Sequence, residues 1–95
     1  MNVISYRKVR DFVALHADSE TSLKAWYRTA KKARWQNLAE VRQVYPHADV
    51  VGVLTVFNIR GNHYRLVAGI NYQYQQIFIK AIMTHEEYDK DNWKT

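Results

Sequence analysis

The hydrophobic pattern changes its period near residue 50, and this change limits the chain to folds with helices first and strands afterwards. Before residue 45, apolar residues recur at spacings of three and four, as on one face of a helix. From Val50 they alternate, as on one face of a strand. Helices followed by a run of strands indicate the α+β class, with the helices packed on a small antiparallel sheet.

Two amphipathic helices are expected in the first third of the chain. Ser5 can cap the first, which should end near His16. The second begins within residues 18–21, where Asp, Ser and Thr offer caps. A third, short helix is expected over Leu38–Val44, closed by Pro46. The first two helices have apolar stripes that consist of Val9, Phe12, Val13 and His16, and of Leu23, Trp26, Tyr27 and Ala30.

Three strands are expected in the second half. The first runs over Val50–Arg60, and Gly61-Asn62 is a two-residue turn signal that joins it to a second strand over His63–Tyr72. A third strand, over Ile77–Met83, is nearly all apolar and therefore expected in the centre of the sheet. Residues 1–4 can add an edge strand. A short helix after the third strand completes the predicted fold.

The predicted hairpin sorts its side chains by face. A two-residue loop opposes Ile59 to Tyr64, Asn58 to Arg65 and Phe57 to Leu66, so each pair shares a face. One face is then core. The other is either an ordinary solvated surface or an oxyanion-binding patch, since nearby sequence offers no carboxylate to pair its cations. This second face carries Asn58, Arg60, His63 and Arg65.

The charge is unevenly distributed. The chain carries 14 Lys and Arg against 9 Asp and Glu, a net charge of +5, which favours a polyanionic partner. The excess lies before residue 46, and between Asp49 and Glu86 there is no carboxylate. One basic run forms either a solvated helix face or a phosphate-binding stripe. It consists of Lys24, Arg28, Lys31, Lys32 and Arg34.

Composition excludes several classes of protein. Ninety-five residues indicate a single domain, 1–95, and the absence of cysteine excludes disulfides and cysteine-based zinc sites. The four histidines lack the spacing of metal ligands. No apolar run reaches the ~18 residues of a membrane span, and the N-terminus lacks a secretory pattern, so we expect a cytoplasmic protein without a membrane partner.

A second dense cluster follows the third strand. Thr84 and Glu87 have the spacing of a capping box, so a helix should begin there. His85 would be its first residue, beside free backbone N–H groups that attract anions and disfavour the imidazolium. His85 is thus either a base or an exposed histidine at a helix start. Tyr88 is either part of the same functional cluster as His85 or an aromatic residue at the edge of the core.

Two segments carry a resemblance to a known family. Residues 56–67 (Val-Phe-Asn-Ile-Arg-Gly-Asn-His-Tyr-Arg-Leu-Val) and 83–89 (Met-Thr-His-Glu-Glu-Tyr-Asp) resemble the signatures of the HigB family of type II toxins. Leu23-x-x-Trp26-Tyr27 and Ala48-Asp49 extend the similarity over almost the whole chain. The family belongs to the RelE/ParE-like toxins, whose helical pair packs on an antiparallel sheet, in agreement with the order of elements above.

The resemblance implies an mRNA endoribonuclease that acts in the ribosomal A site and is neutralised by a HigA-type helix-turn-helix antitoxin. Such toxins cut without metal or cofactor, by attack of a ribose 2′-OH on the adjacent phosphate, and need a base, a cation and an acid. Arg65 would hold the phosphate, and His85 and Tyr88 would transfer protons in an order that spacing leaves open. Supporting RNA contacts would come from Asn62, Lys80, Arg60, His63, Lys31 and Lys32.

Two other functions fit the same sequence. A ParE-like toxin would share the fold but bind gyrase and cut no RNA. A non-catalytic RNA-binding module would bind in a salt-sensitive way and leave no cleavage products.

Overall fold

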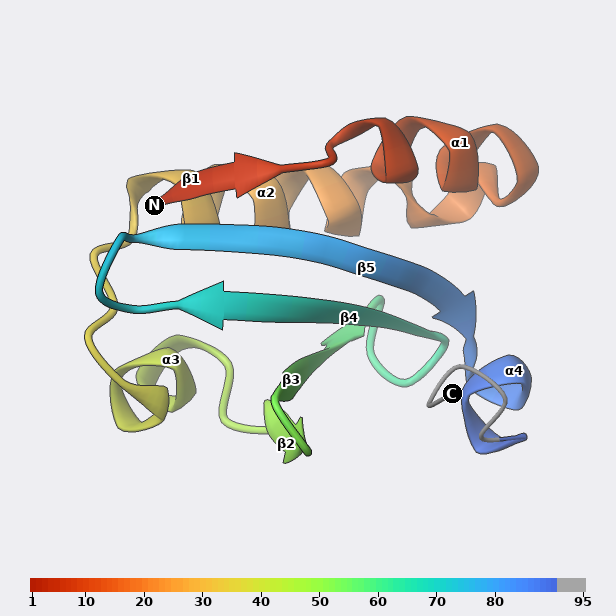
Figure 1. Cartoon of the computed structure of the whole chain (residues 1–95). Helices are drawn as coiled ribbons and strands as arrows, with labels where there is room; N and C mark the ends of the chain where they lie inside the picture. Colours follow the sequence, from red (N-terminus) through yellow and green to blue (C-terminus); the bar gives the residue numbers. More distant parts are fainter. Residues whose placement is uncertain (91–95) are drawn as a thin grey trace.

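The computed structural model describes residues 1–90, so the last five residues of the predicted domain lie outside the described part. The α+β class is confirmed, with a short helix after the last strand (Figure 1). In chain order the elements are β1 (Asn2–Ile4), α1 (Arg7–Leu15), the 3-10 turn η1 (Ala17–Ser19), α2 (Glu20–Lys32), α3 (Leu38–Val44), β2 (Asp49–Val51), β3 (Leu54–Ile59), β4 (Tyr64–Asn71), β5 (Gln76–Thr84) and α4 (His85–Asp89).

The strands of residues 1–90 form one sheet in the order β1-β5-β4-β3-β2. The expected edge strand at the N-terminus is confirmed, but β1 runs parallel to β5, with Asn2 opposite Gln76. The other neighbours are antiparallel. A parallel pair needs a long crossover, which the helices and the remaining strands supply here. The sheet is therefore mixed, and its central strand is β4, whereas β5 was expected there.

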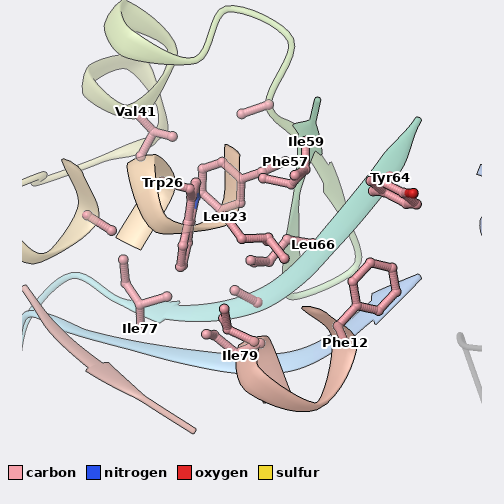
Figure 2. Packing of buried hydrophobic residues seen from close by; sticks show 14 of the residues in the cluster. Phe12, Leu23, Trp26, Val41, Phe57, Ile59, Tyr64, Leu66, Ile77 and Ile79 are labelled. Carbon is pink, nitrogen blue, oxygen red and sulfur yellow. The ribbon is translucent and has the colours of Figure 1, made fainter. Parts of the chain in front are cut away.

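The main core lies between the helices and one face of the sheet (Figure 2). Leu23 and Trp26 of α2 meet Phe57 of β3, Leu66 of β4 and Ile77 of β5, and all five are at most 1% exposed. The Trp26 and Phe57 rings meet edge to face, with centroids 5.4 Å apart. Each such side chain contributes about 1.5–3 kcal/mol by burial. The predicted stripe of α2 and the predicted inner face of the hairpin are confirmed.

One predicted helix has the expected ends, and the predicted start of another is wrong. The bounds of α3 are confirmed, and the Asn37 side chain caps it by accepting a bond from the Glu40 amide. The prediction that Ser5 caps the first helix is wrong, since α1 begins at Arg7 after Tyr6 and no side chain caps it. Ser5 has φ +74°, in the left-handed region, whereas a capping residue needs an extended backbone.

The expected strand over Val50–Arg60 is two strands. Val51 of β2 pairs with Leu54 of β3, and Gly52 and Val53 form a two-residue turn between them. Gly52 has φ +63°, which glycine adopts without strain. Val53 is 92% exposed, although the alternating pattern assigned it to a strand face. Because apolar residues lie on both sides of this turn, the hydrophobic alternation continues through it and does not reveal it.

No helix in residues 1–90 is long and apolar enough to cross a lipid bilayer.

Candidate active site

The tip of the β3–β4 hairpin and the start of α4 meet at one end of the sheet. The predicted hairpin register is confirmed, and the His63 amide donates to the Arg60 carbonyl across the turn, 3.2 Å away. The His85 amide donates to the His63 carbonyl at 3.0 Å and so joins α4 to this tip. A surface pocket of about 480 Å³ opens here, lined by Asn62, His63, Thr84, His85 and Glu86.

Arg65 lies behind this pocket and is 7% exposed. Its Nη1 donates to the backbone carbonyls of Asn62 and Tyr64, both at 3.2 Å. Its Nη2 donates to Asn62 Oδ1 and to His85 Nδ1, the latter at 3.0 Å. All these acceptors are neutral, and no carboxylate of residues 1–90 forms an ion pair with Arg65. Within the described part of the chain, the guanidinium therefore holds its positive charge without a direct counter-ion.

His85 is the first residue of α4, as predicted, and the capping box of Thr84 and Glu87 is confirmed in both of its hydrogen bonds. An arginine can only donate, so His85 Nδ1 must accept the bond from Arg65. His85 Nε2 lies 3.2 Å from Asp89 Oδ2. These two partners assign the proton of the neutral ring to Nε2 and leave Nδ1 basic.

Tyr88 covers the guanidinium on its other side. The Arg65 Cζ lies 5.5 Å from the centre of the Tyr88 ring, a cation–π contact. The same ring packs beside a second, smaller apolar cluster that contains Val56, Val67 and Met83. The outer face was predicted to be either an ordinary solvated surface or an oxyanion-binding patch. It is not simply solvated, because this cluster and α4 bury Arg65.

Arg60 points away from this site. Its left-handed backbone, φ +51°, breaks the alternation of the strand, and its Nη1 lies 3.3 Å from Asp18 Oδ2. The Tyr64 hydroxyl donates to the other oxygen of Asp18. This bond, and then the charge of Arg60, lower the pKa of Asp18, and the same bond raises the pKa of Tyr64. The prediction that no carboxylate pairs with the hairpin cations is therefore wrong for Arg60.

Asn62 and His63 are near Arg65, as predicted. Both line the pocket, and Asn62 is the residue that holds Arg65 through its side chain and its backbone. His63 is exposed, and its Nδ1 lies 2.9 Å from the Arg60 carbonyl.

The predicted lysines are not brought to this pocket. Lys80 lies over Gly69, four residues or about 13 Å along β4 from Arg65. Lys31 and Lys32 end α2 beside β1, where the amino group of Met1 donates to the Lys31 carbonyl. That is the end of the sheet where β5 begins, and nine residues of strand, roughly 30 Å, separate it from α4.

Comparison with known proteins decides the family. Residues 19–91 match HigB_toxin, described as the RelE-like toxic component of a toxin–antitoxin system. The mRNA interferase toxin HigB of Escherichia coli K12 is 30% identical over 92 residues, which cover 94% of this chain and 88% of that protein. The mRNA interferase HigB of Shigella flexneri gives the same values, and that of Escherichia coli O6:H1 is 28% identical over 93 residues, 95% of this chain and 90% of that protein.

The chain belongs to the HigB toxin family. Its RelE-like fold agrees with the mixed sheet and with the short helix after β5. The two segments that carried the resemblance are the β3–β4 hairpin and the β5–α4 junction, which meet at the pocket described above.

Two acidic residues that contact predicted residues of this HigB-family protein were not themselves predicted. Asp89 follows His85 by four positions, a spacing that places both on one face of a helix and could have suggested the contact. Asp18 lies 42 positions before its partner Arg60, and no local pattern in the sequence indicates that pair. Within residues 1–90 no group of three or more His, Asp or Glu is arranged to hold a metal ion.

Proposed function

We propose that this HigB-family toxin is an mRNA endoribonuclease that acts in the cytoplasm on messages in the ribosomal A site. One observation carries the proposal: a buried guanidinium that pairs with no carboxylate of residues 1–90 lies 3.0 Å from the basic nitrogen of a histidine, beside an open pocket. A cation and a base in contact suit cleavage of a phosphodiester. The relatives named mRNA interferase support the same activity.

The proposed reaction uses the RNA as its own nucleophile. A base takes the proton of a ribose 2′-OH, the oxygen attacks the adjacent phosphorus, and the bond from phosphorus to the 5′ oxygen breaks. The leaving 5′ oxygen takes a proton from an acid. The products are a 2′,3′-cyclic phosphate and a 5′-OH end. Negative charge grows on the phosphate oxygens in the transition state, so a nearby cation accelerates the step.

We assign Arg65 to the phosphate and His85 to the 2′ proton. Nδ1 is the nitrogen of His85 that can accept a proton, and the Arg65 contact brings it beside the cation that would bind the phosphate. A phosphate has charged oxygens and competes well for the guanidinium against the neutral acceptors that now hold it. Phosphate binding would then free Nδ1 for the 2′-OH.

Tyr88 is the second group for proton transfer, or a stacking surface for a base. Its ring already contacts the guanidinium, so the two roles need separate tests. Tyr88→Phe keeps the ring and removes the hydroxyl, whereas Tyr88→Ala removes both. Loss of cleavage in both variants supports proton transfer, and loss in Tyr88→Ala alone supports a packing or stacking role.

The remaining polar and basic residues contact RNA away from the reacting phosphate in this proposal. Asn62 and His63 line the pocket and would contact the backbone beside the cut. Lys80, Lys31 and Lys32 are exposed and would contact more distant phosphates of message or ribosome. Arg60 is paired with Asp18 and contributes least.

The antitoxin is part of the proposal as well. Membership of the toxin family implies an antitoxin, and we propose a HigA-type helix-turn-helix protein. A gene for such a protein next to the toxin gene, and recovery of growth when both are expressed, would support this partner.

The test is expression in a bacterial host and reaction of the pure protein with ribosomes that carry a defined message. Wild type should arrest growth and produce 5′-OH ends within the A-site codon, and His85→Ala and Arg65→Ala should abolish both effects. Arg28→Ala, an exposed arginine of α2, is the matched control and should cut normally. Arrest without cut messages but with inhibited gyrase supercoiling would contradict the proposal, as would RNA binding without cleavage.

A further inference from the structure

A second pocket lies on the other side of Asn62 from the active-site pocket. Its volume is about 520 Å³, and its walls come from two segments, the loop that follows α3 and the hairpin tip. Tyr45, Pro46, His47 and Ala48 form the first wall, and Asn58 and Asn62 form the second. None of these residues except Asn62 has a part in the proposed chemistry.

The loop wall is held firmly in place. The Tyr45 ring packs edge to face on Phe57, with centroids 5.4 Å apart, and Ala48 is only 3% exposed. Arg42 Nε donates to the Ala48 carbonyl at 2.9 Å, and the Ala48 amide donates to the Tyr45 carbonyl at 3.0 Å. A pocket with fixed walls loses little entropy when it binds a ligand.

The two pockets are joined through the residues around Arg65. Asn62 lines both pockets and holds the guanidinium. Asn58 is the cross-strand partner of Arg65. An RNA strand whose phosphate lies at Arg65 therefore reaches the second pocket with a neighbouring nucleotide.

The chemistry of the second pocket suits a nucleobase. Pro46 offers apolar surface, and the exposed ring of His47 can stack on a flat base. The half-buried side chain of Asn58 makes no hydrogen bond to any residue of the described part, 1–90, although its amide has both donors and an acceptor. A half-buried amide without a partner inside a pocket is suited to pairing with the edge of a base.

We propose that this pocket binds the base of a nucleotide adjacent to the cut phosphate and that the Asn58 amide reads its edge. The inference rests on the proposed function, and it adds a source of sequence preference separate from the groups that do chemistry. Removing the amide should change which base is preferred without removing Arg65 or His85.

The first experiment varies the message. Single-turnover cleavage is measured on ribosomes whose A-site codon carries each of the four bases in turn at each position. At one position wild type should prefer some bases, and Asn58→Ala should change that preference by about 5- to 150-fold. Asn2→Ala, at an exposed asparagine of β1, is the matched control and should keep the wild-type preference.

The second experiment changes the message, so that its main result, obtained with wild type, does not depend on the folding of a variant. An abasic nucleotide at the preferred position removes the base and keeps the backbone. Cleavage should slow at least fivefold, and Asn58→Ala should lose little more on the same message. Equal rates with abasic nucleotides at every position, or an unchanged base preference in an active Asn58→Ala, would overturn the inference. Failure of wild type to cut any message would instead overturn the proposed function.

Discussion

Two arginines of one hairpin, Arg60 and Arg65, differ in the charge of their partners. Arg60 is exposed and lies 3.3 Å from a carboxylate of Asp18, which neutralises it. Arg65 is buried, and its acceptors are two backbone carbonyls, an amide and an imidazole. An arginine with a carboxylate partner has satisfied its charge within the protein, whereas one with neutral partners still attracts an anion. Partner charge, more than position in the hairpin, separates a structural cation from one available to phosphate.

The backbone produces this difference. Arg65 keeps the regular alternation of β4 and faces the side of the sheet that α4 covers. Arg60 has a left-handed conformation that turns its side chain toward η1 and Asp18. Asp18 thus pairs with Arg60 at the hairpin turn, while Asn62 and His85 accept hydrogen bonds from Arg65 in the site.

The largest effect is expected from the arginines themselves. Arg65→Ala should slow message cleavage by about 10²–10³-fold, the loss typical when one stabilising donor of a transition state is removed. Arg60→Ala should stay within about fivefold of wild type, because an exposed ion pair contributes only about 0–1 kcal/mol. Single-turnover rates on programmed ribosomes measure both, with circular dichroism to verify folding. Equal losses of cleavage rate in the two variants would contradict the claim that partner charge separates the roles of Arg60 and Arg65.

A smaller effect is expected from unpaired cations far from the pocket. Lys31 and Lys32 have no ion pair with a carboxylate of residues 1–90, yet they are exposed and at the other end of the sheet. Replacing both with Glu should weaken ribosome binding up to about tenfold at low salt and flatten its salt dependence. The rate of the bound complex should not change. A loss of that rate would mean that these lysines act on the reacting phosphate.

A still smaller effect on cleavage is expected from a substitution of Asp89. Its Oδ2 lies 3.2 Å from His85 Nε2, and the Asp89 side chain is exposed while that of His85 is partly exposed. Asp89→Asn keeps an acceptor and removes the charge, so cleavage should slow by about fivefold or less. Asp11→Asn, in the exposed pair of α1 with Arg7, is the matched control. A loss comparable to that of Arg65→Ala would place Asp89 in the chemistry.

The smallest effect concerns stability and pH. The pKa of Asp18 is lowered in the folded protein, chiefly by the bond from Tyr64. A lowered carboxyl pKa stabilises the fold above the unfolded value and loses that contribution as pH falls below about 4. Urea unfolding should find wild type more stable than Asp18→Asn at pH 7, and the gap should shrink at pH 3. A gap that is constant between these pH values would contradict the role of this carboxylate.

Local patterns predicted much of the fold and part of the site. The register of Phe57 with Leu66 follows from alternation and a two-residue turn, and the capping box of Thr84 follows from spacing alone. Long-range features were not predictable in this way. The pair of Asp18 with Arg60 and the burial of Arg65 depend on how distant segments pack, to which hydrophobic periodicity is insensitive. The parallel pairing of β1 was missed for the same reason.

The central claim is that Arg65 and His85 work as one unit, and a double-mutant cycle tests it directly. Single-turnover cleavage on programmed ribosomes is measured for wild type, Arg65→Ala, His85→Ala and the double variant. Because the two side chains share a 3.0 Å hydrogen bond, the double variant should lose little more than the worse single variant. Losses that multiply in full would contradict the account, since they would mean that the cation and the base act independently.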